Sequence, residues 1–117
     1  MIRLALILTM LLSQTSNKRV LALYTTSADN ATYKQQIQLL NADKPGLNDR
    51  DIVVETYIYN DKNAALFNKN QIKGFFTVTL TGKDGGEKYR STQPITLQKL
   101  YSTVDAMPMR KQEVKKP

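Results

Sequence analysis

The chain has 117 residues, of which 41% are hydrophobic and 23% charged, and its formal net charge is +7. This length and composition fit one globular domain with a modest core and exclude a disordered or fibrous chain. There is no cysteine and no histidine. Thiol chemistry is therefore excluded, and the commonest zinc ligands and catalytic bases are missing. We expect no metal and no cofactor.

An apolar run opens the chain. Residues 4–12 are interrupted only by Thr9, follow Arg3, and precede the polar stretch 13–19. This pattern is typical of a secretory signal peptide, and the run is shorter than the roughly 20 apolar residues that span a bilayer. The sequence predicts a signal peptide over residues 1–16, export to the periplasm or the extracellular space, and no transmembrane anchor after cleavage. A buried N-terminal strand or helix is the alternative.

The first elements of the domain are a strand and a helix. Val20–Tyr24 reads VLALY and predicts a buried strand. Either Ser27 or Asp29 is expected to cap the helix that follows. Three apolar side chains share one face of that helix: Tyr33, Ile37 and Leu40. The segment Lys44-Pro45-Gly46 is expected to end it.

A second strand comes next. Ile52–Tyr59, IVVETYIY, is β-branched and aromatic, and we expect it to be buried on both faces at its start and partly exposed from Glu55. A strand, helix, strand series predicts a right-handed parallel crossover. Residues 60–70 then predict a short helix capped near Asp61.

A β-hairpin follows. Phe75–Thr81 alternates between apolar and polar residues, and its predicted core face consists of Phe76, Val78 and Leu80. The segment Gly82-Lys83-Asp84-Gly85-Gly86 predicts a tight turn, because its glycines permit positive φ angles. The partner strand is expected over Glu87–Ser91.

The chain closes with a helix and a basic tail. Thr96 is expected to cap a helix that Pro108 stops. Its apolar residues recur at spacings of three and four: Leu97, Leu100, Tyr101, Val104 and Met107. Residues 110–117 are predicted to be a mobile basic tail. The other Lys and Arg residues are dispersed singly, so nucleic-acid binding is not expected.

This order of elements predicts an α/β fold of thioredoxin-like type. The expected core is a central four-stranded mixed sheet (βαβ-α-ββα) with helices on both faces, over residues 17–109.

Three segments carry a resemblance to a known family. They are Arg50-Asp51, the turn Gly82–Gly86 with Lys88, Arg90 and Ser91, and Asp105–Glu113, which reads DAMPMRKQE. Over residues 19–113 the chain resembles the bacterial family of uncharacterised thioredoxin-like domains that is also found in vertebrate sushi-repeat and coiled-coil extracellular matrix proteins. The resemblance implies a peroxiredoxin-like fold of unassigned activity.

The same resemblance shows what the chain lacks. In thioredoxin and peroxiredoxin enzymes the reactive cysteine follows the first strand, at a helix N-terminus. Thr25–Ala31 occupies that place here and contains Ser27. A serine hydroxyl without a histidine base cannot act as the redox centre. Lys73-Gly74 stands where these enzymes have a proline before the third strand.

The candidate binding residues form three groups. Ser27, Asp29 and Asn30 could form a polar-ligand site at a helix start, or simply cap it. Lys83 and Asp84 could contact a ligand, or only shape a turn.

Met109 and Arg110 could grip a partner. Alternatively, the methionines around Pro108 close the core while Arg110 pairs with an acid such as Asp105 or Asp51.

The sequence therefore favours a non-catalytic, cysteine-free thioredoxin-like module of the cell envelope or extracellular space that binds a protein or envelope partner. It assigns no catalytic residue. One alternative is a small-substrate enzyme that uses hydroxyl and carboxylate groups near the start of the first helix. Another is a purely electrostatic binder that acts through its basic tail.

Overall fold

A four-stranded mixed sheet forms the centre of the computed structural model, which describes residues 17–115. The strand order is β2-β1-β3-β4. β1 pairs in parallel with β2 and antiparallel with β3, and β3 pairs antiparallel with β4. The strands are β1 (Arg19–Thr25), β2 (Ile52–Ile58), β3 (Phe76–Thr81) and β4 (Glu87–Ser91). The predicted sheet is confirmed.

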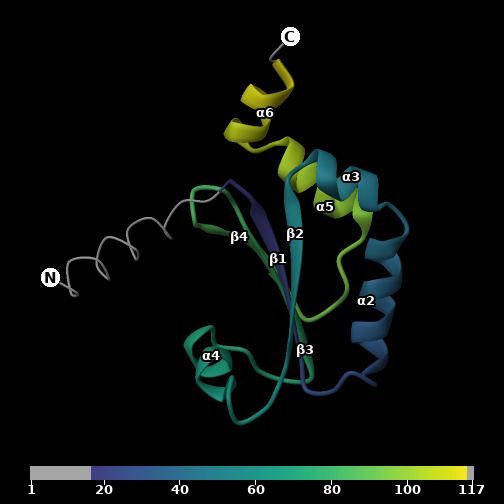
Figure 1. Ribbon diagram of the computed structural model, residues 1–117, viewed down its shortest axis with the longest axis vertical. Helices are drawn as coiled ribbons and strands as arrows, with labels where there is room; N and C mark the ends of the chain where they lie inside the picture. The colour runs from purple at the N-terminus through teal and green to yellow at the C-terminus, as the bar shows by residue number, and fades with distance from the viewer. Residues whose placement is uncertain (1–16, 116–117) are drawn as a thin grey trace, which may run out of the picture.

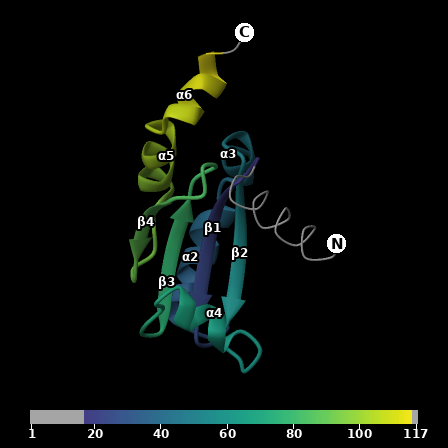
Figure 2. The same ribbon diagram turned by 90° about the vertical axis from the view of Figure 1, so that its left-hand side faces the viewer.

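Helices lie on both faces of this sheet, as predicted. α2, α3 and α5 cover one face, and α4 lies against the other (Figure 1). Seen from the second side, α4 covers only one end of its face (Figure 2). The helices are α2 (Ala31–Asn41), α3 (Lys44–Asp49), α4 (Ala64–Lys69), α5 (Leu97–Asp105) and α6 (Pro108–Lys115).

The main core lies between the sheet and the helices α2, α3 and α5. Leu21 and Leu23 of β1 and Val78 and Leu80 of β3 are fully buried there. They pack with apolar side chains of the covering helices, including Leu40, Leu47, Leu100 and Val104. A smaller cluster on the opposite face consists of Ala22, Tyr24 and Phe67. The alternation predicted for β3 is therefore confirmed on its core face.

One buried polar side chain ties α2 to the segment before α5. Gln36 is fully buried, its Nε2 donates to the carbonyl of Ile95 at 3.0 Å, and its Oε1 accepts from the Ile95 N–H at 2.7 Å. The side-chain amide thus replaces the backbone partner that Ile95 would have in a sheet.

Two predicted helix stops are in fact helix starts. Lys44-Pro45-Gly46 was expected to end the first helix, but it forms the first turn of α3, where Asp43 caps the helix by accepting from the Gly46 N–H at 3.0 Å. Pro108 was expected to stop the last helix, but it begins α6, which continues to Lys115. Proline is favoured in a first turn, because its missing N–H has no partner there. The predicted tail is therefore helical up to Lys115.

The second strand is more exposed than predicted. Only Ile52 is buried, whereas Val53 and Val54 are 36% and 37% exposed. β2 lies at the edge of the sheet, and α4 does not reach the beginning of β2 (Figure 2).

The predicted cap at Asp61 is also wrong, because α4 begins only after Asn63 and has no side-chain cap. The predicted signal peptide, residues 1–16, lies outside the described residues.

Candidate functional site

The fold separates the candidate residues into two groups at opposite ends of the sheet. Ser27, Asp29 and Asn30 lie in the helix-start loop (residues 26–30), which follows the last residue of β1. Because β3 runs antiparallel to β1, the β3–β4 turn lies beside the first residue of β1. There it meets the junction of α5 and α6 (Figure 1). We call this region, built from residues 18–19, 49–51, 82–88 and 103–113, the α6 end.

The polar groups of the helix-start loop bond within the loop or to the first turn of α2. Asn30 caps α2, because its Oδ1 accepts from the Tyr33 N–H at 2.9 Å. The prediction of Ser27 or Asp29 as the cap is wrong, since the helix begins at Ala31 and residue 30 is the one placed to reach its first amides. Ser27 Oγ instead accepts from the Asp29 N–H at 3.1 Å. Ser27 and Asn30 thus shape a turn and a cap, whereas the exposed Asp29 carboxylate lies 3.9 Å from Lys34 Nζ.

At the α6 end, a buried arginine joins the first strand to the last helix. Arg19 is fully buried, and its guanidinium donates to both carboxylate oxygens of Glu113 at 3.3 and 3.2 Å and to the Arg50 carbonyl at 2.7 Å. Lys83 from the β3–β4 turn places its Nζ 2.7 Å from the same carboxylate and 2.8 Å from Asp51. The Glu113 carboxylate on α6 therefore pairs with two basic side chains, Arg19 and Lys83, that are far apart in the sequence.

Arg110 forms the second part of this network. Its Nη2 lies 2.8 Å from Asp49 Oδ2, and its Nε lies 3.4 Å from Asp105 Oδ1. The prediction that Arg110 pairs with Asp105 is confirmed, whereas Asp51, the other predicted partner, pairs with Lys83. The α6 helix buries only Arg110, so charge pairing holds it more than apolar packing does.

Arg50 connects α3 with α5. Its guanidinium binds both oxygens of Asp105 at 3.0 and 3.1 Å and lies 3.9 Å from the centre of the Tyr101 ring. The Tyr101 hydroxyl donates to Asp43 Oδ2 at 3.0 Å. Burial and this hydrogen bond to Asp43 raise the pKa of Tyr101 to about 12, so the phenol stays neutral.

Three carboxylates of the network, those of Asp51, Asp105 and Glu113, have a pKa below the ordinary range. The hydrogen bond from Lys83 lowers the pKa of Asp51, and that from Arg50 lowers the pKa of Asp105. Burial acts to raise the pKa of Glu113, but hydrogen bonds from its basic neighbours outweigh burial and leave that pKa lowered. These three carboxylates are therefore ionised at neutral pH.

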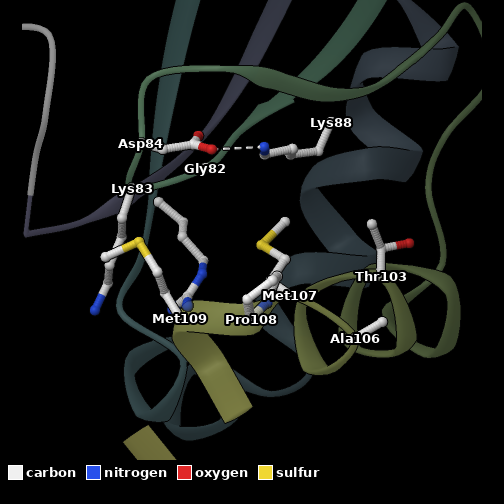
Figure 3. A pocket seen from close by; sticks show the side chains of 10 residues that line it. Gly82, Lys83, Asp84, Lys88, Thr103, Ala106, Met107, Pro108 and Met109 are labelled. Atoms are coloured by element: carbon white, nitrogen blue, oxygen red, sulfur yellow. Dashed lines mark hydrogen bonds and ion pairs between the residues drawn. The ribbon is translucent and has the colours of Figure 1, made fainter. Parts of the chain in front are cut away.

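A pocket of about 290 Å³ opens beside this network. Its lining combines basic and apolar side chains and comes from the start of β1, the β3–β4 turn and the α5–α6 junction: Arg19, Gly82, Lys83, Asp84, Lys88, Thr103, Ala106, Met107, Pro108 and Met109. Figure 3 shows the Asp84–Lys88 ion pair on one side and the Met107–Met109 segment on the other. Three of the predicted candidates thus line one pocket, and Arg110 lies in the adjoining network.

The pocket residues combine structural and exposed positions. Met107 belongs to the core, whereas Met109 is 48% exposed, so only the first methionine closes the core. Asp84 shapes the turn by accepting from the Gly86 N–H at 2.9 Å and pairs with Lys88 at the same distance. Gly85 has a φ of 86°, as the predicted tight turn requires.

Sequence reasoning missed Arg19, Asp49 and Glu113 as parts of the site. Arg19 is the first residue of an apolar strand, and nothing in the sequence indicates that its side chain is buried. Glu113 lies within the segment that carries the family resemblance, which is the one signal that pointed to it.

Among residues 17–115 no group of acidic side chains is arranged to hold a metal ion. Within the same range no helix is long and apolar enough to cross a membrane.

Comparison with solved structures shows the fold class. The chain is similar to a structure described as "Structure of a malarial protein", with a TM-score of 0.63 and 15% identity over 76% of this chain and 96% of that one. It is also similar to reduced 2-Cys peroxiredoxin from Plasmodium vivax, with a TM-score of 0.67 and 9% identity over 87% of this chain and 72% of the other. The mitochondrial 2-Cys peroxiredoxin of Plasmodium falciparum gives a TM-score of 0.60 and 12% identity, over 89% and 83% of the two chains.

These similarities establish a peroxiredoxin-like and thioredoxin-like fold at identities too low to carry an activity. No curated protein matches the chain. The sequence profile of the family described as "Domain of unknown function (DUF4174)" matches residues 10–113. That match covers the whole sheet and nearly all of α6, including every residue of the ion-pair network. The chain therefore belongs to the DUF4174 family.

Proposed function

We propose that the chain is a non-catalytic binding module of the cell envelope or extracellular space, and that it holds a protein or envelope partner at the α6 end. The apolar run at residues 4–12 supports export. So does the resemblance to domains of extracellular matrix proteins.

The contrast between the two ends of the sheet carries this proposal. At the helix-start loop, where peroxiredoxins place their cysteine, this chain has hydroxyl and amide groups that bond to their own turn. At the α6 end, a pocket combines basic side chains with the half-exposed Met109. Exposed apolar surface beside charged groups is typical of an interaction site.

Activity assays on the full chain test the non-catalytic part. The protein is mixed with hydrogen peroxide or a disulfide substrate in the presence of a thiol reductant, and we expect no turnover above the protein-free rate. A kcat/KM of about 10⁴ M⁻¹s⁻¹ or more for either substrate overturns this part. Retention of any measured turnover in a Ser27→Ala, Asp29→Ala double variant excludes the helix-start loop as its source.

Partner capture tests the binding part. Envelope and medium fractions of the source cell are cross-linked to the wild-type chain, to Met109→Glu and to Asp29→Ala. We expect Met109→Glu to lose the captured partner and Asp29→Ala to keep it, because Met109 lies at the pocket and Asp29 at the opposite end of the sheet. Equal capture by all three chains contradicts the α6 end as the binding surface.

A further inference from the structure

We propose that the pocket at the α6 end takes an organic carboxylate: a short apolar group that carries one negative charge. This inference rests on the proposed binding function and names the chemistry of the group that enters. The same chemistry has two sources, the C-terminal residue of a polypeptide and a small free acid.

The size of the pocket limits the occupant to a few carbon atoms. Its volume is about 290 Å³, just below the roughly 300–1,000 Å³ that small-molecule sites enclose. A single apolar side chain or a short acyl chain fits that space.

One wall of the pocket is apolar and adaptable. Ala106, Met107, Pro108 and Met109 supply it from the α5–α6 junction (Figure 3). Met109 is 48% exposed, so it can close over an occupant at little cost to the core. Methionine side chains are flexible and polarisable, which suits them to apolar groups of varied shape.

A buried donor lacks a partner at the same pocket. Arg19 lines the pocket and is fully buried, yet its Nε has no hydrogen-bond partner. Buried donors are almost always satisfied, and a charged donor left without an acceptor is unfavourable. A carboxylate oxygen is the strongest acceptor that an organic ligand offers to a guanidinium.

The charge balance favours a single negative charge. Among the described residues of the α6 end, seven side chains are basic and six are acidic. The basic ones are Lys18, Arg19, Arg50, Lys83, Lys88, Arg110 and Lys111, and the acidic ones are Asp49, Asp51, Asp84, Glu87, Asp105 and Glu113. One positive charge remains, which a monoanion neutralises. The first turn of α6 also lies at the pocket, and the positive end of the helix dipole favours an anion.

Two pairs of probes test the proposal by NMR titration of the full chain. The first pair is an acetylated tetrapeptide that ends in leucine, with a free C-terminal carboxylate or with an amide. The second pair is hexanoate and 1-hexanol. We expect at least one acid to shift the backbone amide signals of residues 82–88 and 106–109, and its neutral analogue to bind roughly tenfold more weakly or worse.

Variants place the binding in the pocket. Lys88→Met removes a half-exposed pocket cation and leaves Asp84 to repel the ligand, so the affinity for the acid falls about tenfold or more. Met109→Glu places a negative charge at a 48% exposed position of the pocket and abolishes binding of the acid. The matched control is Lys34→Met. Lys34 lies on α2, away from the pocket, and pairs with Asp29, so we expect this substitution to leave the affinity for the acid unchanged.

Binding of the peptide acid points to a polypeptide C-terminus, and binding of hexanoate points to a small free acid. Binding of either acid that is weakened in both Lys88→Met and Met109→Glu supports the proposal. Binding of neither acid, or equal binding of acid and neutral analogue, overturns it. If partner capture still depends on Met109 while neither acid binds, the carboxylate inference fails and the proposed function stands. Capture that is independent of Met109 contradicts the proposed function itself.

Discussion

Glu113→Gln is the substitution that most directly tests how the last helix is held. The change keeps the length of the side chain and removes only its charge, which faces the fully buried Arg19 and the nearly buried Lys83. α6 buries no apolar side chain that could compensate, since Arg110 is its one buried residue. After the substitution, the Arg19 guanidinium keeps the Arg50 carbonyl as an acceptor but loses its counter-charge.

The expected cost follows from how deeply this pair is buried. Removing one partner of a buried ion pair destabilises a protein by roughly 3–5 kcal/mol, because the other charge is left in the interior. The Glu113 side chain is 25% exposed, which admits water to one side of the pair. We therefore expect a loss of about 3 kcal/mol in the free energy of unfolding, a large part of the roughly 5–15 kcal/mol of a typical domain.

Urea denaturation followed by tyrosine fluorescence or circular dichroism measures this loss. The matched control is Glu87→Gln on β4, whose carboxylate binds Arg90 at 3.0 and 2.8 Å but is 45% exposed. Exposed pairs contribute only about 0–1 kcal/mol. If Glu113→Gln costs no more than Glu87→Gln, the reasoning that α6 is fastened through Arg19 is refuted.

Three further predictions concern pH, the core and a helix cap. Lys83 lowers the pKa of Asp51, and the basic neighbours of Glu113 outweigh burial and lower the pKa of Glu113. The stabilisation that these two carboxylates contribute is therefore present above the unfolded-state pKa of about 4 and is lost as the pH falls further. Urea midpoints measured from pH 6 to pH 2 should therefore fall, less steeply in Glu113→Gln. Gln36→Met leaves the buried N–H and C=O of Ile95 without partners, so thermal denaturation should show a loss of at least about 2 kcal/mol. Asn30→Ala removes the cap of α2 and should cost about 1 kcal/mol, whereas an unchanged midpoint would show that the cap is dispensable.

The strands and the hairpin were predictable because their signals are local. β3 alternates with period two, and the glycines of the turn at 82–86 permit the backbone that the structure adopts. The two helix stops were misread because proline serves both ends of a helix: it cannot continue one helix, yet it is favoured in the first turn of the next. Pro45 and Pro108 take the second role. The exposure of β2 depends on which strand lies at the edge, which no local pattern specifies.

The site was predictable only in part. Lys83 and Arg110 were singled out, but the acids that bind them, apart from Asp105, could not be assigned from one sequence. Lys83 bonds to a glutamate 30 residues away, and Arg110 to an aspartate 61 residues away. Such pairs arise when strands reverse and helices dock, so they follow from the three-dimensional arrangement. The Arg19 side chain gave no signal, because its burial depends on the arrival of α6.

The pairing of Arg19 with Glu113 also determines when the fold is completed. The two residues are 94 positions apart, so almost the whole domain can be present before the guanidinium has its counter-charge. In such a chain β1 can pair with β2 and β3, but the guanidinium at the beginning of β1 lacks the Glu113 carboxylate. We therefore expect chains that end shortly before Glu113 to have an open, charged end that proteases attack.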